Sequence, residues 1–322
     1  MPPCLTAPIN SITRGCTLID KETLALIGAH GMLAGAVKRN CPQKYHIVPL
    51  DLPGFDITDY NLVFNTLAQV KPDVIMNCAA YTNVDGCESE KALASQVNAR
   101  GPGNLARAAK LTGARLVHIS TDFVFDGEKG LPYIEEDVVD PQSVYGTTKA
   151  QGEKAIVESG LAAYFIVRTS WLYGPGGKNF VDTIIRLAKE NDILRIVSDQ
   201  VGCPTYTEDL AQAVFSLLSL NDTHYGIYHY ANEGQCSWYE FGQEIIRQLR
   251  KKGDSLMVKE TIAIEGKDYP QPAKRPAFSV LSTEKIRQAT GIPIPFWKDS
   301  LKTYIRTRSS DNLLAQIREN HQ

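Results

Sequence analysis

Short apolar runs alternate with helical patterns from residue 23 to residue 174, and this alternation constrains the fold more than any other feature. The apolar runs are "TLALIG", "YHIVPLD", "VIMNCAA", "RLVHISTD" and "YFIVRTSWLYG". Strands that alternate with helices predict a parallel sheet with helices on both faces. The β-branched, apolar character of the runs fits strands buried on both sides. The sequence therefore predicts an α/β fold with a Rossmann-type, doubly wound parallel sheet.

The alternation loosens beyond Trp171, which indicates a smaller second lobe of α/β type. "GIYHYANEGQCSWYEFGQEIIRQLRK" has the pattern of a strand, a loop and a helix, and "DYPQPAKRPAFSVLSTEKI" is rich in proline. We expect an irregular N-terminal extension (1–21), a dinucleotide-binding domain (22–173 and about 196–230) and a substrate-binding lobe (about 174–195 and 231–322).

The composition excludes several classes of function. The chain has 322 residues and a formal net charge of -2, so no basic field indicates a nucleic-acid partner. Its apolar runs are too short to span a membrane. The seven cysteines form no C-x-x-C pair, and no His/Cys cluster has the spacing of a zinc site. We expect a cytoplasmic protein with reduced thiols and no metal.

A glycine-rich turn follows the first predicted strand. Gly28-Ala29-His30-Gly31-Met32-Leu33-Ala34 fits G-x-x-G-x-x-A and opens a helix. Glycines there let the backbone approach a pyrophosphate, which sits at the helix N-terminus. Asp51, at the end of the second strand, is suitably spaced to bind ribose hydroxyls and so favours NADH. The alternative is a plain turn aspartate.

Tyr145 and Lys149 lie four residues apart in "VYGTTKAQGEKAIVESG", a predicted helix with Ser143 as N-cap and Gly160 as its stop. Side chains at this spacing are neighbours. A phenol ordinarily has a pKa of about 10. One charge at ~4 Å supplies about 4 kcal/mol, enough to lower that pKa by ~2–3 units. The pair thus predicts a general acid, with Thr121 of "HISTD" as a nearby hydroxyl. A solvated helix face is the alternative.

Longer motifs extend this pattern over most of the chain. They are "NCAAYTNVDGCESE", "HISTDFVFDG", "VYGTTKAQGEKAI", "RTSWLYG", "NFVDTIIRLAKE", "SDQVGCPT" and "RPAFSVLSTEKI". From about Leu24 to Ile305 the sequence resembles the dTDP-4-dehydrorhamnose reductases, extended members of the short-chain dehydrogenase/reductase superfamily. Ala34 departs from the usual third glycine of the turn.

The resemblance implies a nicotinamide cofactor, NADPH or NADH, and a nucleotide-activated keto sugar as substrate. It implies three catalytic residues: Thr121, Tyr145 and Lys149. Beside Tyr145 and Lys149, the residues expected to bind the cofactor are Gly28, His30, Gly31, Met32, Leu33, Asp51, Asp56, Ile57, Ala79, Ala80, Tyr81 and Asn98. Those expected to face the substrate are Thr121, Asp122, Phe123, Trp171, Asn179 and Arg275.

The superfamily also contains dehydratases, epimerases and a non-catalytic regulatory subunit of methionine adenosyltransferase. Sugar 4,6-dehydratases carry Thr-Asp-Glu where this chain has Thr121-Asp122-Phe123, and phenylalanine cannot move a proton. The retained Thr121, Tyr145 and Lys149 favour an enzyme over the regulatory subunit. We therefore expect a reductase, for which a homodimer is one assembly to test, and keep two alternatives: another nucleotide-sugar reductase or epimerase, and a non-catalytic regulatory subunit.

Overall fold

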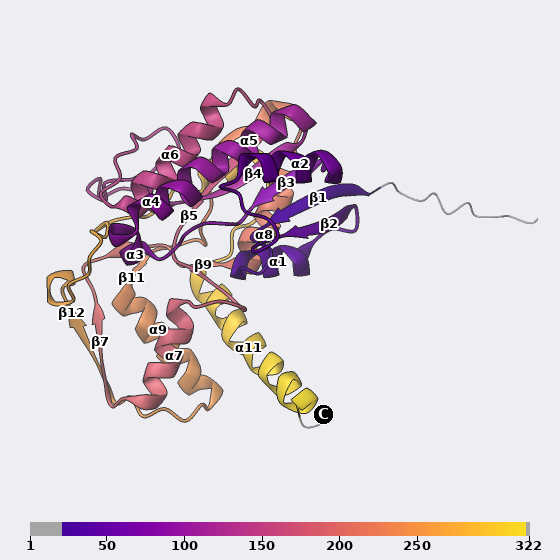
Figure 1. The fold of residues 1–322 in the computed structure, drawn as a ribbon. Helices are drawn as coiled ribbons and strands as arrows, with labels where there is room; N and C mark the ends of the chain where they lie inside the picture. Colours follow the sequence, from indigo (N-terminus) through magenta and orange to yellow (C-terminus); the bar gives the residue numbers. More distant parts are fainter. Residues whose placement is uncertain (1–20, 320–322) are drawn as a thin grey trace, which may run out of the picture.

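The computed structural model describes residues 21–319, with side chains to residue 308, so almost all of the expected N-terminal extension lies outside the described part. Its centre is a parallel six-stranded sheet in the order β10-β5-β4-β3-β1-β2 (Figure 1). The strands are β1 (Glu22–Ile27), β2 (Tyr45–Leu50), β3 (Val74–Asn77), β4 (Arg115–Thr121), β5 (Tyr164–Thr169) and β10 (Gly226–His229).

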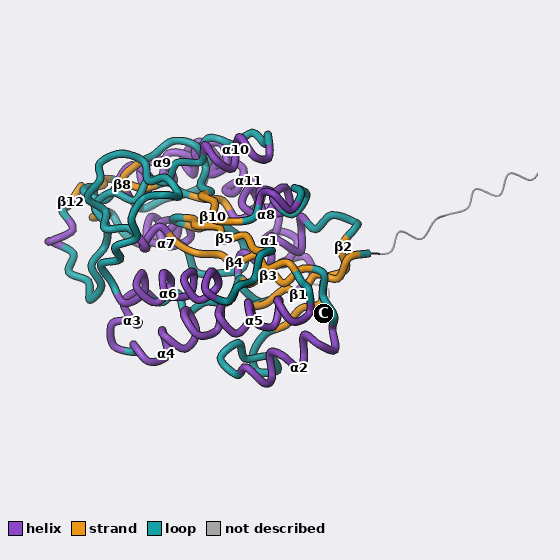
Figure 2. Tube along the Cα trace, turned by 90° about the horizontal axis from the view of Figure 1, so that it is seen from above, coloured by secondary structure: helices purple, strands orange, loops and turns teal. Residues whose placement is uncertain are grey.

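Helices cover both faces of this sheet, as Figure 2 shows. One face carries α2 (Tyr60–Val70), α5 (Gly101–Thr112) and α6 (Val144–Glu158), and the other carries α1 (Met32–Asn40), α8 (Thr207–Leu217) and α10 (Glu284–Thr290). Each face has its own buried apolar cluster, and the strands contribute alternate side chains to the two. The doubly wound α/β fold expected from the sequence is confirmed.

The strand order reverses between β1 and β3, and this reversal determines where a ligand can bind. The chain runs from β1 outward to β2 and then returns to the other side of β1 to form β3. In open parallel sheets, ligands bind beyond the carboxyl ends of the strands at such a reversal. The segments after Ile27, Asn77 and Thr121 all begin at this edge of the sheet.

The long helical segment after β3 is not one regular helix. It forms α3 (Val84–Ser89), α4 (Lys91–Ser95), a π-helical turn (Gln96–Arg100) and then α5. At the π turn, α6 packs unusually close: a Cβ added at Gly152 would lie 2.2 Å from the Asn98 carbonyl oxygen. Only glycine at position 152 permits this approach.

Helix α6 begins and ends as its sequence predicts. The Ser143 hydroxyl accepts a hydrogen bond from the Gly146 N–H at 3.1 Å, and Gly160 beyond the last turn has φ +70°. The N-cap and the stop are therefore confirmed. This matters for the site, because the cap sets where the first turn of the helix lies against the sheet.

A second apolar cluster lies below the sheet in the view of Figure 1. It gathers α7 (Phe180–Glu190), α9 (Trp238–Lys252), the start of α11 (Trp297–Glu319) and β7 (Ile193–Val197), which pairs in parallel with β12 (Glu260–Ile264). Ile286 and Ile294 return to the cluster beneath the main sheet. The division of the chain into two lobes stays a prediction. Ile286 and Ile294 belong to the range expected for the second lobe, yet they pack with the first.

Short strands connect the two clusters. They are β6 (Leu172–Tyr173), which pairs with β9 (Thr205–Tyr206), and β8 (Val201–Gly202), which pairs with β11 (Cys236–Ser237). A 3-10 turn (Asp122–Val124) follows β4. None of the helices within residues 21–319 has the length and apolar character needed to cross a membrane.

A buried ion pair joins α6 to the sheet. Arg168 on β5 donates through Nε and Nη2 to both carboxylate oxygens of Glu153, at 3.0 Å and 2.7 Å for the shorter contacts. The two residues are 2 % and 4 % exposed. Ser120 of β4 also donates to Glu153. Because the ions are paired and hydrogen-bonded, their burial is tolerated, but either one alone is costly.

We predict that Glu153→Gln lowers the free energy of unfolding by roughly 3–5 kcal/mol, because it leaves the Arg168 charge buried without a counter-ion. Urea denaturation measures this. The matched control is Glu190→Gln, which breaks the exposed Arg186–Glu190 pair on α7 and should change stability by no more than about 0.5 kcal/mol. Equal effects of the two substitutions would contradict the prediction.

Candidate active site

The glycine turn lies at the reversal of the strand order. Gly28 has φ +72°, and a Cβ added there would lie 2.7 Å from the backbone nitrogen of Ala79, which follows β3. Gly31 is the N-cap of α1 and contributes no side-chain cap, and the first turn of α1 has no acidic residue. The first N–H groups of α1 are therefore open to an anion, as a pyrophosphate site requires.

Asp51 lies against this turn. Its Oδ2 accepts from the His30 N–H at 2.8 Å and lies 2.9 Å from the His30 Nδ1, while its Oδ1 accepts from the Leu52 N–H at 2.8 Å. The carboxylate thus ties the end of β2 to the glycine turn. Oδ1 accepts only the Leu52 N–H among these contacts and retains a further lone pair, which leaves room for a ribose hydroxyl donor.

Two residues expected at the cofactor have side chains that point into the core. Leu33 packs in the cluster beneath α1, and Ile57 packs in the cluster beneath α5. A ligand in the crevice can reach their backbone atoms only. Asp56 is half-buried, and its Oδ1 accepts from the Thr58 N–H at 2.8 Å.

The segment after β3 is held by two asparagines. Asn77 Oδ1 accepts from the Ala79 N–H at 3.1 Å. The buried Asn98 amide accepts from the Tyr81 N–H at 2.8 Å and donates to the Tyr81 carbonyl oxygen at 3.0 Å. Asn98 therefore positions the crevice wall, and Ala80, between the two fixed residues, is half-buried.

Tyr145, in the first turn of α6, is half-buried next to the end of β4. Its phenol lies close enough to the Thr121 hydroxyl for that hydroxyl to influence the pKa of the phenol. Thr121 in turn donates to Asp122 Oδ1 at 2.9 Å and accepts from the Phe123 N–H at 3.2 Å. The tertiary structure thus brings together the phenol and the hydroxyl that the sequence places 24 residues apart.

The expected lowering of the phenol pKa is wrong for this structure. Burial raises the pKa of Tyr145 above its ordinary value, and the nearby Thr121 hydroxyl opposes that rise only in part. The Lys149 amine contacts the Ile119 carbonyl oxygen and His118 instead of the phenol. A phenol with a raised pKa remains protonated at neutral pH, which suits a proton donor.

Lys149 is 1 % exposed, and its Nζ donates to the Ile119 carbonyl oxygen at 2.7 Å. Burial lowers the pKa of this lysine to about 8, while Glu153, one turn further along α6, raises it. The amine therefore changes its charge close to neutral pH. A lysine with this property is suited to proton-coupled chemistry.

Hydrogen bonding determines the tautomer of His118. Asn77 Oδ1 is engaged by the Ala79 N–H, so its amide nitrogen donates to His118 Nδ1 at 3.0 Å. The ring proton then sits on Nε2, 3.2 Å from Lys149 Nζ. Because Nζ can accept this proton only as a free amine, His118 favours the uncharged form of Lys149. Burial also holds the pKa of His118 well below its usual range.

Phe123 contacts the Tyr145 ring, and Arg275 lies near Phe123. The Phe123 ring meets the Tyr145 ring edge to face, with 5.5 Å between centroids, and the Arg275 guanidinium lies 5.8 Å from the Phe123 centroid. Asp122, which precedes Phe123 in the chain, is 2 % exposed, and burial raises the pKa of this carboxyl to about 6. Arg275 comes from the proline-rich segment, so that segment reaches the catalytic helix.

Trp171 begins the connection to the second cluster in a left-handed conformation, with φ +46°. Its ring stacks on Trp238 of α9, with centroids 3.5 Å apart and planes 8° apart. A Cβ at Gly202 would lie 2.5 Å from the Trp171 ring, so glycine is needed beneath it. Trp238 was not expected at the site, because nothing near it in the sequence indicates chemistry.

Asn179 has a structural task in addition to its expected place near the substrate. Its side chain caps α7 by accepting from the Asp182 N–H at 3.0 Å, and it donates to the Gly174 and Gly177 carbonyl oxygens at 3.1 Å each. It also lies 3.9 Å from the Met32 sulfur. Asn179 thereby holds the 174–177 loop against the start of α1.

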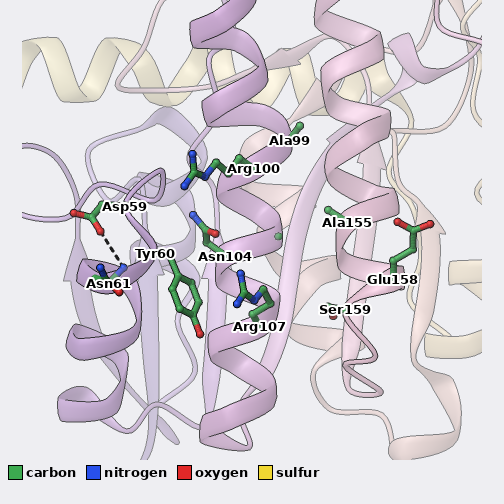
Figure 3. Close-up of a pocket in the computed structure, with 11 residues that line it drawn as sticks. Asp59, Tyr60, Asn61, Ala99, Arg100, Asn104, Arg107, Ala155, Glu158 and Ser159 are labelled. Carbon is green, nitrogen blue, oxygen red and sulfur yellow. Dashed lines mark hydrogen bonds between the residues drawn. The ribbon is translucent and has the colours of Figure 1, made fainter.

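A pocket of about 800 Å³ lies elsewhere, between α2, α5 and the end of α6 (Figure 3). Tyr60, Arg107 and Glu158 help to line it, and the Arg107 guanidinium lies 4.2 Å from the Tyr60 ring centroid. Its α6 residues begin at Ala155, well past the first two turns, which carry Tyr145 and Lys149. The pocket is therefore separate from the candidate active site.

The residues at the carboxyl edge of the sheet fit a dinucleotide. A glycine turn with open N–H groups suits a pyrophosphate, Asp51 suits a ribose, and a buried lysine and a protonated phenol lie where the crevice meets β4. No group of His, Cys, Asp and Glu side chains in residues 21–319 is arranged to hold a metal ion. The arrangement can bind a nicotinamide dinucleotide and give a proton to a carbonyl oxygen.

The chain is similar to known reductases over most of its length. The family model described as RmlD substrate binding domain matches residues 22–310. A dTDP-4-dehydrorhamnose reductase of Aggregatibacter actinomycetemcomitans is 41 % identical over 285 residues, which cover 87 % of this chain and 97 % of that protein.

The chain is also similar to solved structures of dTDP-4-dehydrorhamnose reductases. The dTDP-4-dehydrorhamnose reductase of Clostridium acetobutylicum aligns with a TM-score of 0.84 and 43 % identity over 89 % of this chain and 99 % of that one. That of Bacillus anthracis, solved in complex with NADP, aligns with a TM-score of 0.83 and 37 % identity over the same shares, 89 % and 99 %.

We predict that one lysine of the protein titrates with a pKa of about 8, because burial disfavours the charged form of Lys149. Below that pH the side chain is charged, and above it the amine is neutral. NMR titration of the lysine side-chain carbons measures this, and the signal should vanish in Lys149→Arg. If every lysine signal titrated near the ordinary value of about 10.4, the prediction would be wrong.

Proposed function

Because the chain belongs to the dTDP-4-dehydrorhamnose reductase family, we propose that it reduces the C4 keto group of dTDP-4-dehydro-6-deoxy-L-mannose with NADPH or NADH, giving dTDP-L-rhamnose. It is an oxidoreductase of the class that acts on CH–OH groups, and the proposed reaction runs in the direction that reduces a keto group to CH–OH. The observation that carries this proposal is the meeting of the Tyr145 phenol and the Thr121 hydroxyl at the end of β4, one helical turn from the buried Lys149.

The cofactor would be held by the groups already described at the carboxyl edge. The open N–H groups of α1 suit its pyrophosphate, and Asp51 suits the adenosine ribose. Met32 follows β1 and Tyr81 follows β3, the two neighbouring strands at which the strand order reverses. Lys149 would contact the nicotinamide ribose. When bound, the nicotinamide supplies a hydride.

The chain's own residues would supply a proton and would orient the carbonyl group of the substrate. Tyr145 would donate its phenolic proton to the C4 oxygen as negative charge develops there. Thr121 would donate a hydrogen bond to the same oxygen, which requires its hydroxyl to rotate away from Asp122. Lys149 in its charged form would stabilise the phenolate that remains.

The substrate would approach from the side of the second cluster. Trp171 stacks on Trp238 of that cluster, while Phe123 contacts Tyr145 and Arg275 lies near Phe123. A guanidinium suits a diphosphate, and exposed rings suit the flat faces of a base or sugar. Asn179 supports this side through the 174–177 loop.

Three alternatives remain distinguishable by one assay. A dehydratase needs an acidic residue where Phe123 stands, and that ring packs on Tyr145 here. An epimerase regenerates its cofactor and shows no net consumption, and a regulatory subunit shows no reaction. Purified protein should oxidise NADPH or NADH only when the keto sugar is added, with dTDP-L-rhamnose as product. Unchanged cofactor absorbance would overturn the proposal.

We also propose a cytoplasmic location and a homodimeric state. The first is supported by the free thiols of Cys87, Cys203 and Cys236, which are buried and unpaired with one another in the described residues. Light scattering of the purified protein tests the second.

We predict that Tyr145→Phe lowers turnover by ~10²–10⁴-fold, because it removes the proton donor and nothing else. Cofactor binding, measured by fluorescence, should be nearly unchanged. Tyr60→Phe, on the outer surface of α2, is the matched loss of one hydroxyl and should retain full turnover. Near-wild-type turnover of Tyr145→Phe would remove this residue from the mechanism.

Asp51 is predicted to favour NADH over NADPH, because its carboxylate can accept from ribose hydroxyls and repels a 2′-phosphate. Asp51→Ala should lower the ratio of kcat/KM for NADH to that for NADPH. Asp73→Ala removes the same charge at the opposite edge of the sheet, where Asp73 accepts from the Thr23 N–H, and should leave the ratio unchanged. An unaltered ratio in Asp51→Ala would show that another residue contacts this ribose.

A further inference from the structure

Asp85, in the first turn of α3, binds the proline-rich segment that carries Arg275. Its Oδ1 accepts from the Ala273 N–H at 3.2 Å, and its Oδ2 accepts from Arg275 Nη2 at 2.9 Å. One carboxylate thus holds both the backbone and the guanidinium of a segment almost 190 residues away in the sequence. The motif "NVDGCESE", to which Asp85 belongs, has no other task assigned to its aspartate.

Asp85 is itself held in place by its own helix. Asn83 caps α3 by accepting from the Gly86 N–H at 3.0 Å. On the same helix, Glu88 accepts from the Val144 N–H at 2.8 Å, at the beginning of α6. Helix α3 therefore contacts both the proline-rich segment and the first turn of the helix that carries Tyr145. A shift of α3 would move both together.

The contacts of Arg275 leave part of its guanidinium available. Nε donates to Gln271 Oε1 at 2.9 Å, and Nη2 donates to Asp85. Within the described residues, Nη1 makes no hydrogen bond and no ion pair. The guanidinium also lies 5.8 Å from the Phe123 ring centroid, which in turn contacts Tyr145. Gln271, Asp85 and the Phe123 ring thus surround the guanidinium, while its two Nη1 donors remain for an anion.

We infer that Asp85 is a positioning residue, which orients Arg275 so that its remaining donors bind the diphosphate of the nucleotide sugar. This inference rests on the proposed function for the identity of the ligand. An arginine side chain loses much rotamer freedom when it binds, and a partner that orients it beforehand removes part of that cost. The Asp85 and Arg275 side chains are 34 % and 20 % exposed, so their ion pair adds little to stability.

If Asp85 competed with the ligand for Arg275, the change in binding affinity would have the opposite sign. A carboxylate beside the diphosphate site can also compete with the ligand for Arg275, and its removal would then strengthen binding. The contact of Asp85 with the Ala273 N–H favours positioning, because it fixes the backbone that carries the arginine as well as the side chain. The sign of the change in affinity therefore separates the two roles.

The experiment measures binding of dTDP by titration calorimetry, together with steady-state kinetics on the nucleotide sugar. Asp85→Ala should weaken dTDP binding and raise KM roughly three- to tenfold, which corresponds to the loss of about one ordinary hydrogen bond. Turnover should stay within about twofold, and the Kd for NADPH should not change, since Asp85 contacts only the other ligand's segment.

A double-mutant cycle measures whether the effects of Asp85 and Arg275 on dTDP binding depend on each other, which a purely structural role of Asp85 would not produce. Arg275→Ala should weaken dTDP binding at least as much as Asp85→Ala, and Asp85→Ala/Arg275→Ala should bind dTDP no more weakly than Arg275→Ala alone. The control is Asp192→Ala, which removes a carboxylate from the exposed Lys259–Asp192 pair and should leave dTDP binding unchanged.

The outcomes separate this inference from the proposed function. Unchanged or tighter dTDP binding in Asp85→Ala, or additive effects in the double variant, overturns the positioning role even if the enzyme reduces the keto sugar. Failure of the wild-type chain to bind dTDP also overturns it. If the cycle behaves as expected while no nucleotide sugar is reduced, the positioning role stands and the proposed reaction falls.

Discussion

The burial of one charged face of α6 against the central sheet is the constraint on which the rest of the site depends. Tyr145, Lys149 and Glu153 follow one another at intervals of four residues, so they share that face. Lys149 and Glu153 are 1 % and 4 % exposed. Burying a charge costs several kcal/mol unless a partner compensates, and here Arg168 and the Ile119 carbonyl oxygen do so. These contacts fix the rotation of the helix and thereby bring Tyr145 to Thr121.

The same packing couples the catalytic helix to the cofactor crevice. Gly152 lets α6 approach the π turn, where Asn98 lies. Asn98 uses its amide to hold the Tyr81 backbone, which forms the crevice wall after β3. On the other side, Asn77 contacts both Ala79 and His118, and His118 contacts Lys149. The crevice wall and the lysine are thus linked by hydrogen bonds that leave each of these polar groups satisfied.

The polar groups at the site have pKa values set mainly by burial. The pKa of Tyr145 is raised and that of Lys149 is lowered to about 8, so burial shifts both groups toward their neutral forms, although Lys149 is still mostly charged at neutral pH. This differs from the simple expectation that the lysine makes the phenol more acidic. Direct charge coupling requires the ammonium to lie near the phenol, whereas the lysine points toward His118 and the sheet. Such a site keeps its proton on the donor until negative charge develops on a bound carbonyl.

The sequence alone was sufficient for the α/β fold, the glycine turn, the cap and stop of α6, and the family. These depend on local patterns, namely strand–helix alternation, glycines at fixed offsets and Ser143 and Gly160 at the helix ends. Glu153 could also have been predicted, because it repeats the four-residue spacing from Tyr145 to Lys149. Local patterns are informative here because hydrogen bonding and periodicity act over a few residues.

Only the tertiary structure decided which distant residues complete the site. Trp238 stacks on Trp171, and Asp85 binds Arg275 across almost 190 residues, yet neither pair has a spacing that a sequence could reveal. The direction of the Tyr145 pKa shift was decided in the same way. Burial and the orientation of Lys149 are properties of packed side chains, and packing is determined by contacts between elements rather than by the order of residues within one.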